Sequence, residues 1–257
     1  MFEETEIKRL ELGKGVTSLK DKIVKEVPLT IKINGEEFAT LLASPNKLNE
    51  LAVGYLYVEG IIKERADLKS IELNPKTYIV SVELKNTIKE EDFKKKRVLT
   101  SGCGKNISFY NYEDFENCPP VESDLKIQAE TILKLMNEFQ KQSEVFRETG
   151  GVHSAALCEA GRIISFTEDI GRHNAFDKIV GELVISGNSP KDKFLLSSGR
   201  ISSEMLIKCG RIGIPIVVSR SAPTDMAVRL GRQLKITLAG FARGNRMNIY
   251  CGGGIYV

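Results

Sequence analysis

The chain of 257 residues has no tryptophan and only two histidines. It contains no CxxC pair, so we expect no metal site of the tetrahedral cysteine type. Its five cysteines follow no regular spacing, which argues against a disulfide framework and favours a reducing, cytoplasmic location. No secretory h-region and no apolar run long enough to span a bilayer occur, so we expect no membrane association.

The sequence also lacks the common signatures of phosphate-binding and nucleic-acid-binding proteins. Neither a Walker A loop nor a GxGxxG fingerprint is present. The net charge of +3 is too small to indicate a nucleic-acid partner. Hydrophobic residues make up 42% of the chain, which is enough to build a sizeable core in one large domain or two closely packed ones.

The first half of the sequence predicts a small α+β domain over residues 1–123. We expect residues 1–20, which are polar, to be frayed. Asn34-Gly35 is a strong signal for a type I′ hairpin turn. Ser44-Pro45 resembles an N-cap followed by proline, which predicts a helix that ends near Gly60. Strands are predicted over residues 22–33, 37–43, 70–73 and 77–84.

The second half, residues 124–257, alternates strands with helices and predicts an α/β domain with a parallel or mixed sheet. One long amphipathic helix is expected over residues 124–146. A hairpin is expected over residues 153–158 and 162–167. Further strands are predicted over residues 194–198, 214–219, 236–239 and 247–251, with helices over residues 173–184, 202–211 and 224–234.

Cys103 differs from the other cysteines in its surroundings. It lies between Gly102 and Gly104, and Lys105 follows two residues later. The glycines remove bulk around the thiol, and a nearby cation lowers a thiol pKa and increases the reactive thiolate. Cys103 is therefore our candidate nucleophile, and the alternative is a small residue in a tight turn.

Basic residues gather near the C-terminus. From Lys193 onward there are ten Lys or Arg residues and two acidic ones. Arginine forks suit bidentate contacts with phosphate. We expect Arg200, Arg220, Arg243 and Arg246 to lie in loops where a ligand could bind, and other arginines to face solvent on helices.

One segment that contains two of these arginines combines charge, amide donors and an aromatic ring. This combination suits a nucleotide or a similar phosphorylated heterocycle. Its residues are Phe241, Ala242, Arg243, Gly244, Asn245 and Arg246. His173 stands in a predicted loop with Asp169 and Arg172, and we expect it to bind a ligand or handle a proton. For His153 a structural role and a functional one stay equally open.

Several motifs together resemble the formate dehydrogenase accessory sulfurtransferase family (FdhD-type). They occur in the family's order and cover the chain from about Lys22 onward. The motifs are Leu51-Ala52-Val53-Gly54-Tyr55-Leu56 through Glu59-Gly60-Ile61-Ile62, Ser101-Gly102-Cys103-Gly104, Thr149-Gly150-Gly151-Val152-His153, Glu168-Asp169-Ile170-Gly171-Arg172-His173-Asn174, Ser198-Gly199-Arg200 and Ser219-Arg220-Ser221-Ala222-Pro223-Thr224.

The resemblance implies a sulfur carrier that is a homodimer. Such proteins take persulfide sulfur from a cysteine desulfurase and pass it to the bis-molybdopterin guanine dinucleotide cofactor of formate dehydrogenase. By this resemblance Cys103 holds the persulfide, and residues 241–246 bind the guanine dinucleotide, for which a guanine nucleotide is a possible mimic. The resemblance also implies a cytidine-deaminase-like layered domain. Many members carry CxxC at this loop, whereas here Asn106 takes the second position.

Two alternatives remain open from the sequence. A zinc deaminase needs an H-x-E element and a P-C-x-x-C element, and the candidate segment here reads His153-Ser154-Ala155. A non-catalytic chaperone would bind and deliver the cofactor without carrying sulfur. The chaperone would retain its function in a Cys103→Ala variant, whereas the sulfurtransferase would lose it.

Overall fold

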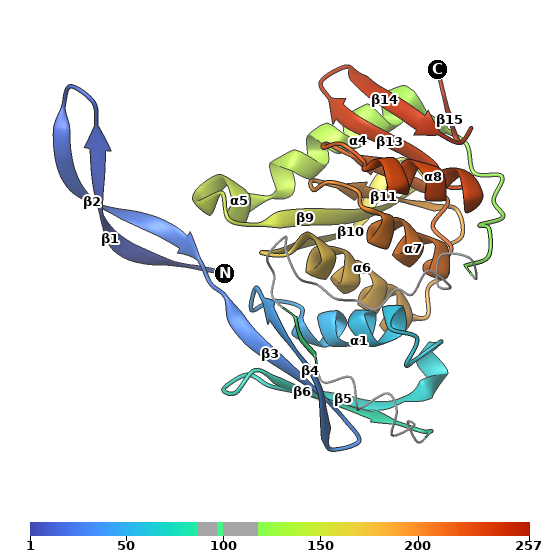
Figure 1. Ribbon diagram of the computed structural model, residues 1–257, viewed down its shortest axis with the longest axis horizontal. Helices are drawn as coiled ribbons and strands as arrows, with labels where there is room; N and C mark the ends of the chain where they lie inside the picture. The colour runs from blue at the N-terminus through green and yellow to red at the C-terminus, as the bar shows by residue number, and fades with distance from the viewer. Residues whose placement is uncertain (87–96, 100–117) are drawn as a thin grey trace.

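The structure is a computed structural model that describes residues 1–86, 97–99 and 118–257 (Figure 1). The largest sheet in these segments has six strands, in the order β10-β9-β11-β12-β13-β14. The strands are β9 (His153–Glu159), β10 (Arg162–Asp169), β11 (Lys193–Ser197), β12 (Ile216–Ser219), β13 (Thr237–Arg243) and β14 (Arg246–Cys251). Strands β11, β12 and β13 are parallel and the other pairings are antiparallel, which confirms a mixed sheet.

Helices cover both faces of this sheet (Figure 1). Helix α4 (Ala129–Gln142) lies on one face, and α6 (Arg172–Ser186), α7 (Ser203–Ile212) and α8 (Asp225–Gln233) lie on the other. Successive side chains of β9 point to opposite faces of the sheet, and both faces are buried. Ala156 and Cys158 pack on the face that α4 covers, whereas Ala155 and Leu157 pack on the face that α6 and α7 cover. Helix α8 is capped by Thr224, whose hydroxyl accepts a hydrogen bond from the Ala227 amide.

A second sheet of five strands lies beyond these helices, in the order β5-β6-β3-β4-β7. Its strands are β3 (Val27–Ile33), β4 (Glu36–Ala43), β5 (Leu68–Asn74), β6 (Ile79–Leu84) and β7 (Arg97–Leu99), and a short 3₁₀ helix, η1 (Arg65–Asp67), precedes β5. Asn34 and Gly35 have φ angles of 49° and 88°, so the predicted left-handed turn between β3 and β4 is confirmed.

Helix α1 (Leu48–Val58) fills the space between the second sheet and α6. Its Gly54 packs directly against the backbone of Asp177 on α6. One continuous hydrophobic cluster therefore includes buried side chains from both halves, such as Leu51 on α1 and Ile179 on α6. Whether the halves before and after residue 123 fold as separate domains stays a prediction.

The expectation of a frayed start is wrong. Residues at the N-terminus form a two-stranded ribbon, β1 (Phe2–Glu11) and β2 (Gly15–Val24), which stands off from the body (Figure 1). The turn uses Gly13 and Gly15, whose φ angles of 82° and 88° suit glycine. Lys22 at the base of the ribbon forms an ion pair with Glu148.

Two further expectations differ from the structure. The predicted helix over residues 124–146 is divided into β8 (Ile127–Gln128), α4 and α5 (Glu144–Thr149), and β8 pairs with β15 (Ile255–Tyr256). The break between α4 and α5 falls at Ser143, whose hydroxyl donates to the carboxylate of Glu168. Ser44 does not cap α1, which begins at Leu48 after Lys47 in the left-handed region. No helix in the described segments is both long and apolar enough to cross a membrane.

Candidate functional site

The register of the six-stranded sheet brings most of the predicted ligand residues to one edge. Strands β11, β12 and β13 run parallel, so their carboxyl ends meet there. Strand β9 is antiparallel to β11 and begins at this edge with His153. The edge therefore holds residues 198–200, residues 219–224 and residues 241–246, the position where ligands bind in open α/β sheets.

The segment from Phe241 to Arg246 comprises the end of β13, the turn at Gly244-Asn245 and the first residue of β14. Arg243 and Arg246, predicted to lie in loops, are therefore paired strand residues at the two ends of this turn. Phe241 adopts a φ of 51° and leaves 40% of its surface exposed. The guanidinium carbon of Arg243 lies 5.9 Å from the centre of the Phe241 ring. Gly244, Asn245 and Arg246 are exposed, whereas Ala242 is buried and anchors the segment. An aromatic face and two cations are thus presented together to solvent.

Arg220 and Arg243 meet directly at this edge. The Nε of Arg243 donates a hydrogen bond of 3.0 Å to the carbonyl oxygen of Arg220. Arg200 is exposed at the end of the neighbouring strand. The hydroxyl of Ser219 donates to the Gly199 carbonyl at 2.6 Å, which fixes the loop that carries Arg200. Arg200 and Arg220 follow the carboxyl ends of β11 and β12, as predicted, and Arg243 lies at the carboxyl end of β13, opposite Arg246 at the start of β14.

His173 lies at the β9 side of the edge, in the first turn of α6. Its side chain is 12% exposed, and Nε2 lies 3.4 Å from a carboxylate oxygen of Glu204 on α7. Burial lowers the pKa of His173 well below the ordinary value, and the charges of Lys208 and Arg172 lower it further. His173 is therefore a neutral imidazole in the fold rather than an exposed cation.

A second pair of side chains joins α6 to α7, one helical turn after His173 and Glu204. The ammonium of Lys208 donates to both carboxylate oxygens of Asp177, at 2.8 and 2.9 Å, and both side chains are buried. Burial raises the pKa of Asp177 to about 6, and the charge and hydrogen bonds of Lys208 oppose that rise. The spacing of four residues on each helix places His173 above Asp177 and Glu204 above Lys208.

A third buried pair holds α6 to the N-terminal half. Lys178 lies 2.7 Å from a carboxylate oxygen of Asp169, and both side chains are fully buried. The same carboxylate accepts from the backbone amide of Ser44, and the Ser44 hydroxyl accepts from the amide of Ile170. Ser44 thus links two segments that are 125 residues apart, in place of the predicted capping role.

Cys103 lies outside the described residues. The other four cysteines are free thiols, and all are buried. Burial raises the pKa of Cys158 to about 12 and also raises that of Cys209, where the charge of Lys208 opposes the rise. Burial likewise raises the pKa values of Cys118 and Cys251. Each of the four is therefore a protonated, poorly nucleophilic thiol at neutral pH.

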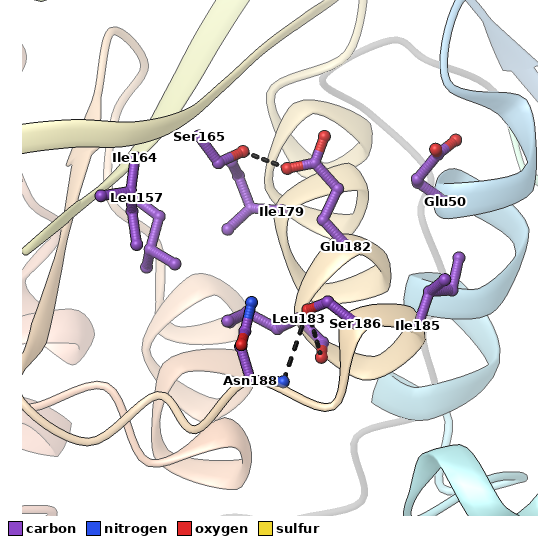
Figure 2. A pocket seen from close by; sticks show the side chains of 10 residues that line it. All are labelled: Glu50, Leu157, Ile164, Ser165, Ile179, Glu182, Leu183, Ile185, Ser186 and Asn188. Atoms are coloured by element: carbon purple, nitrogen blue, oxygen red, sulfur yellow. Dashed lines mark hydrogen bonds between the residues drawn. The ribbon is translucent and has the colours of Figure 1, made fainter.

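A separate cavity of about 270 Å³ opens between α6 and the β9–β10 hairpin (Figure 2). Apolar side chains such as Ile164 and Ile179 line it, and the hydroxyl of Ser165 donates to Glu182 on its wall. Glu182 also forms an ion pair with Lys47. The cavity contains none of the predicted ligand residues. In the described segments no group of three or more His, Cys, Asp or Glu side chains is arranged to hold a metal.

Two contributors to the polar edge were not predicted from the sequence. Glu204 and Lys208 each contact a residue that lies far away in the chain. The only local signal is the spacing of four residues, His173 with Asp177 and Glu204 with Lys208, on two predicted helices. That spacing predicts a polar face on each helix but not that the two faces meet.

The arrangement defines a class: mixed α/β proteins in which helices lie between a six-stranded and a five-stranded sheet. A crystal structure from Desulfotalea psychrophila, assigned as a formate dehydrogenase accessory protein, shares this fold and superposes with a TM-score of 0.79. The two are 25% identical, and the match covers 97% of this chain and 96% of the other.

The chain belongs to the FdhD/NarQ family, whose model matches residues 24–255. It is 41% identical over 244 residues to the sulfur carrier protein FdhD of Bacillus subtilis, a match that covers 94% of this chain and 92% of that protein. The protein of the same name from Staphylococcus aureus (strain MRSA252) is 41% identical over 245 residues, or 95% of this chain and 92% of the relative.

Proposed function

We propose that this protein carries sulfur for the maturation of formate dehydrogenase, with Cys103 as the carrier. The relatives named above are sulfur carrier proteins, and their similarity extends over nearly the whole chain. A solved structure with the same fold is assigned as a formate dehydrogenase accessory protein. The glycines and the lysine around Cys103 suit an accessible, activated thiol.

The observation that carries the assignment to Cys103 concerns the other thiols. Cys118, Cys158, Cys209 and Cys251 are buried, and burial raises the pKa of each. A carrier must present a thiolate to a donor protein, which these four positions do not favour. This exclusion supports Cys103 as the residue that accepts sulfur.

The loading step needs one thiolate and one donor persulfide. The Cys103 thiolate attacks the outer sulfur of a persulfide on a cysteine desulfurase and forms a new S–S bond. The S–S bond of the donor breaks, and the donor cysteine leaves as a thiolate. No oxidant or second cysteine of this chain is consumed, so Asn106 in place of the second CxxC cysteine does not prevent the step. The relay makes the protein a sulfurtransferase.

The proposed acceptor is the bis-molybdopterin guanine dinucleotide cofactor, which is bound as cargo. The Phe241 ring offers a face on which guanine can stack, and Arg243 and Arg246 offer donors to the diphosphate. Arg200 and Arg220 extend the basic edge along the neighbouring strands. The proposal includes a cytoplasmic homodimer and a cytidine-deaminase-type layering of the C-terminal half.

The test is mass spectrometry of the protein after incubation with a cysteine desulfurase and free cysteine. We expect one added sulfur atom on the peptide that contains Cys103 and none in a Cys103→Ala variant. A formate dehydrogenase activation assay then separates the two functions that the sequence left open. A Cys103→Ala variant that still activates the enzyme would identify a cofactor-binding chaperone and overturn the carrier role.

A further inference from the structure

The β1–β2 ribbon projects from the body of the protein (Figure 1). In the described part of the chain, β1 and β2 form a sheet of their own with no third strand. The ribbon is tied to the body at its base, where Lys22 pairs with Glu148 and Val24 lies against Gly151. A two-stranded hairpin is marginally stable in water and normally needs a further strand or a packing helix.

Apolar side chains along the ribbon are only partly covered. Leu10 and Val16, which lie opposite each other near the tip, are 68% and 59% exposed. On the other face, Ile7 and Leu19 are paired with each other and half-buried, and Ile23 on the same face is exposed. A run of exposed apolar side chains along one element indicates a surface that another protein covers.

The outer edges of the ribbon carry free backbone groups. Among the described strands β1 pairs with β2 alone, so alternate N–H and C=O groups of β1 point outward over ten residues. Such an edge pairs readily with a strand of another chain. A closed dimer requires the same edge of both copies to meet across a two-fold axis, because a contact between unlike edges builds an open filament.

The charges of β2 do not suit pairing of this strand with itself. Opposite residues in a sheet share a face, and side chains alternate along each strand. In an antiparallel pair about a two-fold axis, even-numbered residues therefore face even-numbered ones. The central lysines of β2, Lys20 and Lys22, are even-numbered, whereas its one acid, Asp21, is odd-numbered. No register of β2 against itself therefore sets a lysine opposite an acid.

Strand β1, in contrast, is complementary to itself. Its first half contains Glu3 and Glu4, and its second half contains Lys8 and Arg9. A register centred on Glu6 sets Glu4 opposite the partner's Lys8 and Glu3 opposite the partner's Arg9, and the symmetry repeats each pair.

The same register also brings apolar residues together. It sets Phe2 opposite the partner's Leu10, which is one of the exposed residues at the tip. It places Ile7 at a diagonal position about 7–8 Å from the partner's Ile7, within reach of a large side chain. The pair of Ile7 and Leu19 on each ribbon is thereby joined to its copy across the axis.

Neighbouring registers are less favourable. A shift by one step in either direction brings glutamates together in contacts that the symmetry repeats, Glu3 with Glu11 or Glu4 with Glu6. The register centred on Glu6 has one contact between like charges, that of the two Glu6 side chains on the axis. Each of these faces Lys20 within its own ribbon, which offsets the repulsion.

We propose that β1 pairs antiparallel with β1 of a second copy of this chain, in a register centred on Glu6. The two ribbons then form one continuous sheet in the order β2-β1-β1-β2. The inference rests on the homodimer of the proposed function and assigns the surface that joins its two copies. Backbone hydrogen bonds and the apolar pairs supply the affinity, whereas the exposed ion pairs, each of which is worth little, select the register.

The two-fold axis allows the register to be tested by cross-linking. In a Cys103→Ser background, Glu6→Cys sets a thiol opposite its own copy at a Cα separation of about 4.5–5.5 Å, which suits a disulfide. Oxidised glutathione should then produce a covalent dimer on a non-reducing gel. Ser18→Cys, exposed in the middle of β2, is the matched control and should remain monomeric, since Cys118, Cys158, Cys209 and Cys251 are buried. A covalent dimer of Ser18→Cys, or none of Glu6→Cys, would overturn the proposal.

Sedimentation velocity over a series of protein concentrations measures the association without a cross-link. Arg9→Glu should weaken the dimer by about tenfold, because the symmetry creates two contacts between glutamates. Adding Glu3→Arg to the same chain should restore the association, since the opposite charges then face each other again. Arg229→Glu makes the same change of net charge at an exposed position on α8 and should associate as the parent does. A double variant that stays as weak as Arg9→Glu would contradict the register.

The outcomes distinguish this interface from the proposed function. A parent protein that is monomeric at every concentration overturns the homodimer and the ribbon interface together, whereas a dimer that Arg9→Glu leaves unchanged overturns the ribbon interface alone. A Glu6→Cys protein that cross-links to added formate dehydrogenase and not to itself would identify the client as the occupant and overturn self-pairing. Persulfide loading of Cys103 is measured separately by mass spectrometry, and its absence overturns the carrier function only.

Discussion

Gly54 on α1 lies against Gly181 on α6 with no space for a side chain between the helices. A Cβ at Gly54 would fall 1.8 Å from the Asp177 carbonyl oxygen and 2.8 Å from the Gly181 nitrogen. A Cβ at Gly181 would fall 1.8 Å from the carbonyl oxygen of Glu50. The two backbones therefore touch, which places the backbone of Asp177 directly against α1.

A Gly54→Ala substitution should destabilise the protein strongly. The methyl group forces α1 away from α6, and overpacking of this kind costs about 3 kcal/mol, which exceeds the gain in helix propensity of about 1 kcal/mol. Urea unfolding measures the loss as a lower midpoint. Gly253→Ala is the control, because a Cβ there meets nothing within 4 Å. Equal midpoints for the two variants would contradict the close contact.

Acidification should destabilise the protein in part through His173. The unfolded chain titrates near the ordinary value of 6.5, whereas burial lowers the pKa in the fold. Below about pH 6.5 the unfolded chain therefore binds more protons, so stability is lost as the pH falls. The slope for one histidine reaches about 1.4 kcal/mol per pH unit.

A His173→Gln variant should therefore show a shallower loss of unfolding free energy between about pH 6.5 and about pH 5. Asp177, whose pKa is raised to about 6, contributes the opposite trend, because its buried carboxylate becomes charged as the pH rises. It is present in both proteins, so the comparison isolates His173. Urea unfolding at several pH values provides the measurement, and parallel curves would show that His173 does not titrate as described.

Guanine nucleotide binding should depend on Arg243 and not on Arg229. Arg243 stands beside the Phe241 ring at the exposed turn, whereas Arg229 is paired with Asp225 on the surface of α8. Loss of one charge-assisted contact to phosphate weakens binding by about tenfold. Isothermal titration with guanosine diphosphate should show this loss for Arg243→Gln and no change for Arg229→Gln. Equal affinities would remove the Phe241 segment from the proposed site.

Alkylation of the folded protein should be confined to one cysteine. Iodoacetamide reacts with thiolates, and the buried thiols of Cys158 and Cys209 are protonated and covered. At neutral pH we expect the label on the Cys103 peptide, with the remaining cysteines modified only after unfolding in urea. Peptide mass spectrometry reads the positions. Early labelling of Cys158 would contradict its burial.

The sequence correctly predicted those turns and hairpins that are determined by a few neighbouring residues. The turn at Asn34-Gly35 and the hairpin before and after Gly161 are both present. The N-terminal ribbon was missed because its residues are mostly polar, although Gly13 and Gly15 between two alternating segments were a usable signal. These cases follow from backbone preference and periodicity alone.

Features that depend on hydrogen bonds between residues far apart in the chain could not be predicted from the sequence. Ser44 has the residue type and position of an N-cap, but its hydroxyl is held by Ile170 in the other half of the chain. The Ser143 break in the predicted long helix depends on Glu168 in the same way. At the candidate site, composition identified the arginines individually, whereas the shared edge became evident only from the order of the strands.

The β1–β2 ribbon has a consequence for where the chain tolerates substitution. The family model begins its match at residue 24, where the second strand of the ribbon ends. Leu12 at the turn is 95% exposed, so substitutions there remove no packing from either sheet. Packing in the core therefore places little constraint on the residues at the tip of this ribbon.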